Sequence, residues 1–108
     1  MTKYFVGVDL GQSRDYTAVA VIDRAEETGD WDAVQYAWRK KVSLRLRHLE
    51  RIALGTPYPE VVARVREITR SNELRERCQV MVDATGVGRP VVDQMRSAGD
   101  FTGRHSAT

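Results

Sequence analysis

Residues 4–11 read YFVGVDLG, a short apolar run that ends in a carboxylate and a glycine. Apolar residues alternate along the run, and Asp9 stands where a buried strand would leave its sheet. Residues 78–88, CQVMVDATGVG, repeat the arrangement with Asp83. The two stretches therefore predict two buried strands, each of which presents an aspartate at its carboxyl end.

Two further strands are predicted between these stretches. Residues 16–23, YTAVAVID, are rich in β-branched side chains and would pair with the first strand as an antiparallel hairpin. Residues 24–32 are highly charged, which predicts a loop without a core contribution. A third strand is expected between about residues 33 and 52, with apolar groups on one face and arginines on the other. The alternation breaks near His48, which predicts a bulge or a bend there.

From about Tyr58 the spacing of apolar residues changes to that of a helix packed on the sheet. Its stripe is expected to hold Val61, Val62, Val65 and Ile68, with Asn72 as a candidate further member. A second helix is predicted over residues 90–97. A helix between two neighbouring strands implies a parallel, right-handed crossover. The sequence thus predicts one α/β domain, residues 1–108, with a mixed sheet in the order 3-2-1-4. Strands 1 to 3 are antiparallel in this prediction, and strand 4 is parallel to strand 1.

That order places Asp9 and Asp83 on neighbouring parallel strands, at the same edge of the sheet. Such strands lie about 4.8 Å apart, so the two carboxylates would share one divalent cation. Hard oxygen ligands favour Mg²⁺ or Mn²⁺, and a cation held in this way suits metal-assisted phosphoryl chemistry. Asp15 is a candidate supporting ligand, with a role in the turn as its alternative. The alternative for the pair is that each aspartate only caps a turn; taken jointly, the two favour a metal site.

Several polar residues are candidates for contacts with phosphate. Those in the turns beside the acids are Ser13, Arg14, Thr85 and Gly86. Arg45 and Arg47, on the third strand, would follow a DNA backbone, with a solvated strand face as the alternative. The aromatic residues Trp31, Tyr36 and Trp38 are expected to pack in the core or at a sheet edge.

Composition bounds the setting of the protein. The net charge is +2, but residues 1–38 hold three basic and seven acidic side chains, whereas residues 39–77 hold eleven and five. The arginine-rich middle suggests a phosphate-rich partner, against the alternative of ordinary solvated surface. Cys78 is the single cysteine, no secretory signal opens the sequence, and no run approaches the roughly 20 apolar residues of a membrane span. A cytoplasmic protein without a membrane partner is therefore expected.

Three stretches carry a resemblance to a known family. Residues 6–23, 46–65 and 80–95 resemble the ribonuclease-H-like nuclease domain of phage terminase large subunits, in particular the terminase-like proteins of phages and prophages. The resemblance implies a ribonuclease-H-like fold, catalysis by Asp9 and Asp83 with Mg²⁺ or Mn²⁺, and double-stranded DNA as the substrate. It further implies a role in phage DNA packaging in a bacterial host, alongside other packaging proteins.

The chain also departs from that family. Such nucleases carry a third acid after at least one further strand, and residues 101–108, FTGRHSAT, offer neither. The chain is therefore expected to be the N-terminal portion of a nuclease domain, with the outer edge of strand 4 uncovered and open to self-association. Two alternatives stay open. One is an actin-like ATPase fragment, because VDLGQS and VDATGVG resemble phosphate loops; the other is an inactive remnant that binds DNA or a partner.

Overall fold

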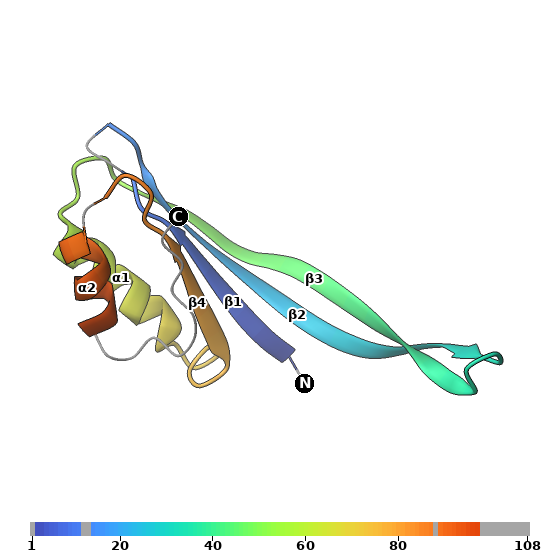
Figure 1. Ribbon diagram of the computed structural model, residues 1–108. Coiled ribbons are helices and arrows are strands. Elements are labelled where there is room, and N and C mark those ends of the chain that lie inside the picture. Colours follow the sequence, from blue (N-terminus) through green and yellow to red (C-terminus); the bar gives the residue numbers. More distant parts are fainter. Residues whose placement is uncertain (1, 12–13, 88, 98–108) are drawn as a thin grey trace.

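The computed structural model describes residues 2–11, 14–87 and 89–97. Its elements are β1 (Thr2–Asp9), β2 (Thr17–Asp32), β3 (Ala37–Ile52), α1 (Tyr58–Thr69), β4 (Cys78–Asp83) and α2 (Arg89–Ser97). The sheet order is β3-β2-β1-β4, with β1 parallel to β4 and the other neighbours antiparallel. This confirms the predicted α/β class, strand order and strand directions. Both helices lie on the same side of the sheet (Figure 1).

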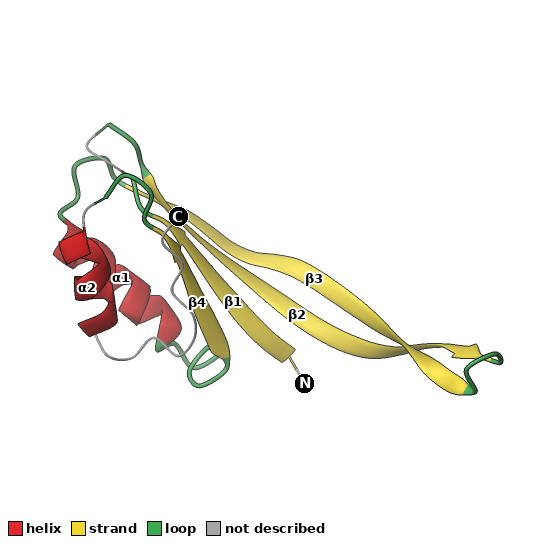
Figure 2. Ribbon diagram, in the orientation of Figure 1, coloured by secondary structure: helices red, strands yellow, loops and turns green. Residues whose placement is uncertain are grey.

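The hydrophobic core lies between the two helices and one face of the sheet. Alternate residues of β1, β2 and β4 are buried there, and most of them are valines. The core side chains include Val6, Val8, Val19, Val21, Val80 and Val82 from the sheet, and Val61, Val62, Val65 and Met95 from the helices. Because successive strand residues point to opposite faces, the residues between these valines lie on the other face of the sheet. No helix covers that second face in the described part of the chain (Figure 2).

The predicted loop over residues 24–32 is wrong. These residues continue β2, which pairs with β3 along a two-stranded arm that projects beyond β1 and β4 (Figure 1). The carboxylate of Asp32 closes the arm by accepting hydrogen bonds from the backbone N–H groups of Val34 (2.9 Å) and Gln35 (3.1 Å). Tyr36 completes the turn in a left-handed conformation, with φ of 58°. A turn of this kind lacks the Asn-Gly or Asp-Gly signal by which hairpins are usually predicted.

Pairs of side chains across the arm explain why a charged segment forms a strand. Glu27 lies opposite Lys41, and the guanidinium of Arg39 lies 3.4 Å from the Asp32 carboxylate. Opposite charges on facing strands stabilise a sheet, whereas the same charges on one strand alone would not. The acidic first third and the basic middle of the sequence thus meet along β2 and β3.

The aromatic residues at the end of the arm were predicted to pack in the core or at a sheet edge. They do neither. Trp31 makes edge-to-face contacts with Tyr36 and Trp38, each with ring centroids 5.2 Å apart. All three rings are exposed. They form a small cluster whose partners are one another.

The bulge predicted near His48 is confirmed. The pairing of β2 with β3 shifts between Val21 and Ile22, whose partners are His48 and Leu46. Arg47 is therefore the extra residue of the bulge. Its guanidinium reaches the helix side of the sheet, where it forms an ion pair with the buried carboxylate of Asp23.

A bidentate ion pair joins α1 to β3. Glu50 accepts hydrogen bonds from Nε (2.8 Å) and from a terminal nitrogen (2.6 Å) of Arg64, and a third from the His48 ring (3.0 Å). The Arg64 guanidinium is the main cause that lowers the pKa of Glu50 to about 2. Because this pKa lies below the ordinary value of 4.5, the pair stabilises the fold above about pH 4.5 and ceases to do so as pH falls through about 2.

We expect Glu50→Gln to lower the free energy of unfolding at pH 7 by about 1 kcal/mol, since both partners are partly exposed to water. The difference from the wild type should shrink as pH falls from 4.5 towards 2, because the wild-type carboxylate then becomes protonated. Urea unfolding at a series of pH values measures it. A difference that stays constant down to pH 2 would show that the pair does not act through its charge.

Two further features of the fold bear on partners. β4 forms one edge of the described sheet, so self-association along that edge remains a prediction. Neither described helix is long and apolar enough to cross a membrane.

Candidate functional site

The two aspartates singled out in the sequence lie side by side. Asp9 on β1 and Asp83 on β4 are register partners at the carboxyl ends of parallel strands. Both are exposed, and both lie on the sheet face away from the helices. A shallow groove of about 410 Å³ runs beside them. Its lining, besides the two aspartates, consists of Gly7, Val8, Ala18, Ala20, Met81 and Val82.

Small residues in the neighbouring strands leave room in front of the carboxylates. A side chain at Gly7 would meet no atom within 4 Å, which shows how open this part of the face is. Ala18, the β2 partner of Asp9, and Ala20 extend the same low surface. The groove is thus open to solvent and to a ligand.

The surrounding backbone holds the two strand ends together. The N–H of Leu10, just after Asp9, donates to the carbonyl of Asp83 (2.9 Å), and the Leu10 side chain is buried in the core. The parallel pairing therefore continues past the two acids. Their relative position is set by the sheet rather than by a loop.

The two carboxylates have different surroundings. The carboxylate of Asp9 makes no hydrogen bond or ion pair with any described residue, whereas Oδ1 of Asp83 accepts from the backbone N–H (3.0 Å) and the hydroxyl (2.7 Å) of Thr85. Asp83 therefore does cap the turn after β4, as the alternative reading held. Capping also fixes its carboxylate, since the turn and the strand together orient it.

The donor set fits a hard divalent cation. Two adjacent carboxylates supply oxygen ligands, and Mg²⁺ is commonly held by one or two carboxylates together with water and substrate phosphate. No group of three or more Asp, Glu, His or Cys side chains comes within reach of one ion among residues 2–11, 14–87 and 89–97. Asp15 lies in a different hollow and does not complete the pair.

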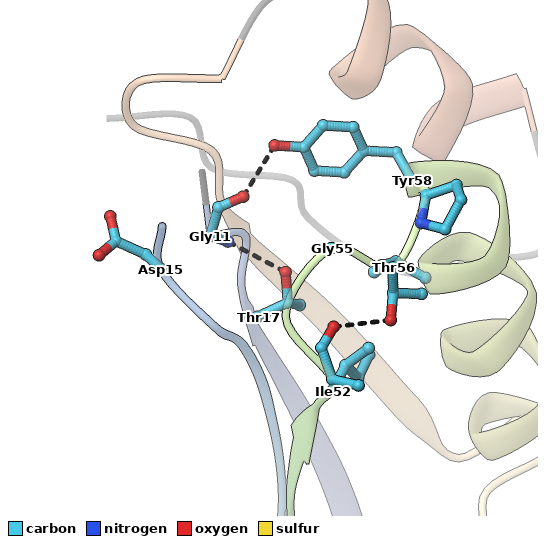
Figure 3. Close-up of a pocket in the computed structure, with 10 residues that line it drawn as sticks. Gly11, Asp15, Thr17, Ile52, Gly55, Thr56 and Tyr58 are labelled. Carbon is cyan, nitrogen blue, oxygen red and sulfur yellow. Dashed lines mark hydrogen bonds between the residues drawn. The ribbon is translucent and has the colours of Figure 1, made fainter. Parts of the chain in front are cut away.

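That second hollow, of about 340 Å³, lies between the β1–β2 turn and the start of α1 (Figure 3). The Tyr58 hydroxyl donates a hydrogen bond to the carbonyl of Gly11 (2.7 Å). The backbone N–H of Gly11 in turn donates to the Thr17 hydroxyl (3.0 Å). The carboxylate of Asp15 points away from the other residues in Figure 3. A side chain at Gly11 would overlap the Asp15 carbonyl oxygen, so this close turn requires glycine.

Loss of the Tyr58 hydroxyl tests how firmly α1 anchors the turn that follows Asp9. We expect Tyr58→Phe to lower the free energy of unfolding by about 1 kcal/mol, because the Gly11 carbonyl loses its donor in a half-buried place. The matched control is Tyr36→Phe, at the exposed end of the arm, which should change little. Denaturant midpoints compare them; equal midpoints for both variants and the wild type would contradict a role for this bond.

The candidate phosphate contacts are placed differently from one another. Thr85 and Gly86 follow Asp83 in the exposed turn, where Gly86 has φ of 82°. Arg14 is exposed in the turn between β1 and β2, and Ser13 lies outside the described residues. These turns stand at the same edge of the sheet as the two aspartates. A backbone running along that edge would meet them.

Arg45 and Arg47 lie on the opposite side of the sheet from the two aspartates. Nε of Arg45 donates to Oδ1 of Asp23 (3.2 Å), and Arg47 lies 3.3 Å from Oδ2 of the same carboxylate. Asp23 is fully buried among the core residues. Both arginines therefore compensate an interior charge.

No protein-family model matches the sequence, and no curated protein is significantly similar to it.

Proposed function

We propose that this chain is the metal-binding part of a DNA endonuclease of the phage terminase type. In this proposal Asp9 and Asp83 hold Mg²⁺ or Mn²⁺, and the chain hydrolyses phosphodiester bonds of double-stranded DNA. It acts in the cytoplasm of a bacterial host, together with other packaging proteins. The observation that carries the proposal is the pairing of Asp9 with Asp83 at the ends of parallel strands, on an open sheet face.

Each part of the site has a role in this proposal. The Asp9 carboxylate, which has no partner among the described residues, and the Asp83 carboxylate, which is oriented by Thr85, supply the ligand oxygens. A bound cation would activate water and screen the charge of the phosphate. The groove over Gly7 and Ala18 leaves space for the DNA backbone to approach. At the same edge of the sheet, the turn with Arg14 provides a guanidinium group and the turn with Gly86 provides backbone N–H groups for contacts with phosphate.

A second candidate is an inactive remnant of the fold that binds DNA or a partner. Two observations favour it: Oδ1 of Asp83 already accepts two hydrogen bonds from Thr85, and the described residues bring no third acid to the pair. A remnant would keep the sheet and the turn cap but would not bind metal. The two candidates therefore differ in one measurable property.

Nicking of supercoiled plasmid tests the proposed activity. The chain should convert supercoiled plasmid to the open-circular form with Mn²⁺ or Mg²⁺, and EDTA should stop the reaction. Circular dichroism of the same sample controls for folding. A folded protein that leaves the plasmid intact with either cation would favour the remnant.

A further inference from the structure

Arg51 lies in the same row of the sheet as the two aspartates. Its register partner on β2 is Ala18, whose partner on β1 is Asp9, and Asp9 pairs in turn with Asp83 on β4. Adjacent strands lie about 4.8 Å apart, so the backbones of Arg51 and Asp9 are separated by about 10 Å. The row therefore runs across the sheet from two carboxylates to a guanidinium group.

The chain neighbours of Arg51 establish which face of the sheet it occupies. Glu50 forms its ion pair with α1, and Ile52 packs against the core, so both side chains point to the helix side. Because successive strand residues alternate, the exposed Arg51 side chain points to the face that carries the aspartates. Ala18 lies between Arg51 and Asp9 and lines the groove beside the carboxylates, so no large side chain separates the two charges.

An aromatic ring, rather than an acid, contacts the guanidinium of Arg51. Its central carbon lies 4.6 Å from the centroid of the Tyr16 ring. The other arginines of β3, which are Arg39, Arg45 and Arg47, each form an ion pair with an aspartate. The Arg51 guanidinium forms no ion pair or hydrogen bond with any described residue. Its N–H donors are therefore available to a ligand.

The separation between this guanidinium and the acids suits a ligand with more than one anionic group. An arginine in direct contact with Asp9 or Asp83 would compete with a metal cation for the carboxylate oxygens. The Tyr16 ring instead attracts the guanidinium through a cation–π contact, which leaves the carboxylates free. A nucleic acid strand carries one phosphate per nucleotide, so a strand with one phosphate at the carboxylate pair presents a neighbouring phosphate nearby.

We propose that Arg51 binds a phosphate of the DNA strand next to the phosphate at the Asp9–Asp83 cation, and that Tyr16 positions the Arg51 guanidinium. A planar guanidinium can donate to two oxygens of one phosphate. The contact favours a polynucleotide over a substrate with a single phosphate, since only the former reaches both groups. The inference rests on the proposed function for its ligand, but the Arg51 contact itself needs no bound cation.

Fluorescence anisotropy of a short labelled DNA duplex, in EDTA and at a series of KCl concentrations, tests this contact without the cation. Arg51→Gln should weaken binding about fivefold at low salt. Its plot of log affinity against log salt should be shallower by about 0.9, the contribution of one phosphate contact. The matched control is Arg39→Gln, which removes the same charge near the other end of β3 and should bind as the wild type does. Circular dichroism confirms that each variant is folded.

Two variants of Tyr16 test its role as a positioning residue. Tyr16→Phe keeps the ring and should bind the duplex with the affinity and salt dependence of the wild type. Tyr16→Leu removes the ring and should weaken binding. That loss should disappear when Arg51→Gln is already present, because the ring acts through the guanidinium. A loss that persists in the double variant would reject the positioning role.

Three results would overturn the Arg51 contact: a wild type without affinity for the duplex at low salt, an Arg51→Gln variant with unchanged affinity and salt dependence, or an equal loss in Arg39→Gln. Plasmid nicking separates this inference from the proposed function. A wild type that binds the duplex through Arg51 but nicks no plasmid with Mn²⁺ would support the contact and reject the endonuclease.

Discussion

Asp9→Asn and Asp83→Asn should each reduce the metal-dependent nicking of plasmid DNA by more than about 100-fold. A bound cation contributes several kcal/mol to the hydrolysis of a phosphate ester, and each 1.36 kcal/mol corresponds to a factor of ten in rate. Either change removes one of the two carboxylate charges that the described residues bring to this site. Because both side chains are exposed, the amide replacements should leave the fold intact.

The matched control for these variants is Asp30→Asn, which changes an exposed aspartate on the arm in the same way. It should nick DNA at the wild-type rate. Initial rates of conversion to open-circular plasmid, at fixed Mn²⁺ concentration, compare the four proteins. Residual nicking of equal rate in all four would show that the activity does not arise at the carboxylate pair.

The largest expected loss of stability comes from removing the two cations that compensate Asp23. The double variant Arg45→Ala/Arg47→Ala should lower the free energy of unfolding by about 3 kcal/mol, because it strands a buried carboxylate. Oδ2 of Asp23 has no hydrogen-bond partner in the described residues, so its 3.3 Å contact with Arg47 contributes through charge alone. Urea unfolding followed by circular dichroism measures the change.

Arg39→Ala/Lys40→Ala provides the control for that experiment. It removes two exposed cations from the same strand, at a part of the arm beyond the core, and should cost less than about 1 kcal/mol. If the two double variants lost equal stability, Arg45 and Arg47 would not be stabilising the buried charge of Asp23. The variant Asp23→Asn with both arginines intact then separates charge from packing.

The sheet could be predicted because its strands and the helix packed on it have distinct patterns of apolar residues. The runs before Asp9 and Asp83 are short, are apolar on both faces of the strand and end in turns. This pattern is typical of strands in the interior of a sheet. The spacing of Val61, Val62 and Val65 is equally specific for a helix face. Because connections between parallel strands are right-handed, these elements fix the strand order and bring the two aspartates together.

The arm escaped the sequence prediction because its stability arises between strands. Residues 24–32 carry acids that disfavour a strand when considered alone. In the arm, basic side chains of β3 lie opposite these acids and compensate their charge. The same fact explains the charge distribution along the sequence. The basic middle was interpreted as a surface for phosphate, whereas part of its charge faces the acids of β2, as Arg39 faces Asp32.

Arg45 and Arg47 show the limit of alternation as a guide to exposure. Alternation correctly separated Leu44 and Leu46 from the arginines, but it cannot say which face a helix will cover. In this protein the helices cover the arginine side, where Asp23 requires compensation, and the leucines face outward. The sheet face away from the helices therefore carries exposed apolar side chains, among them Leu44, Leu46 and Leu49.

Calorimetric titration of Mn²⁺ into the wild-type chain and into Asp9→Asn tests the central claim most directly. The claim is that Asp9 and Asp83 form one cation site. We expect saturable binding to the wild type and loss of that binding in Asp9→Asn, with Asp30→Asn as the control that keeps it. A folded wild type that takes up no Mn²⁺, or an Asp9→Asn variant that binds as tightly as the wild type, would contradict the claim.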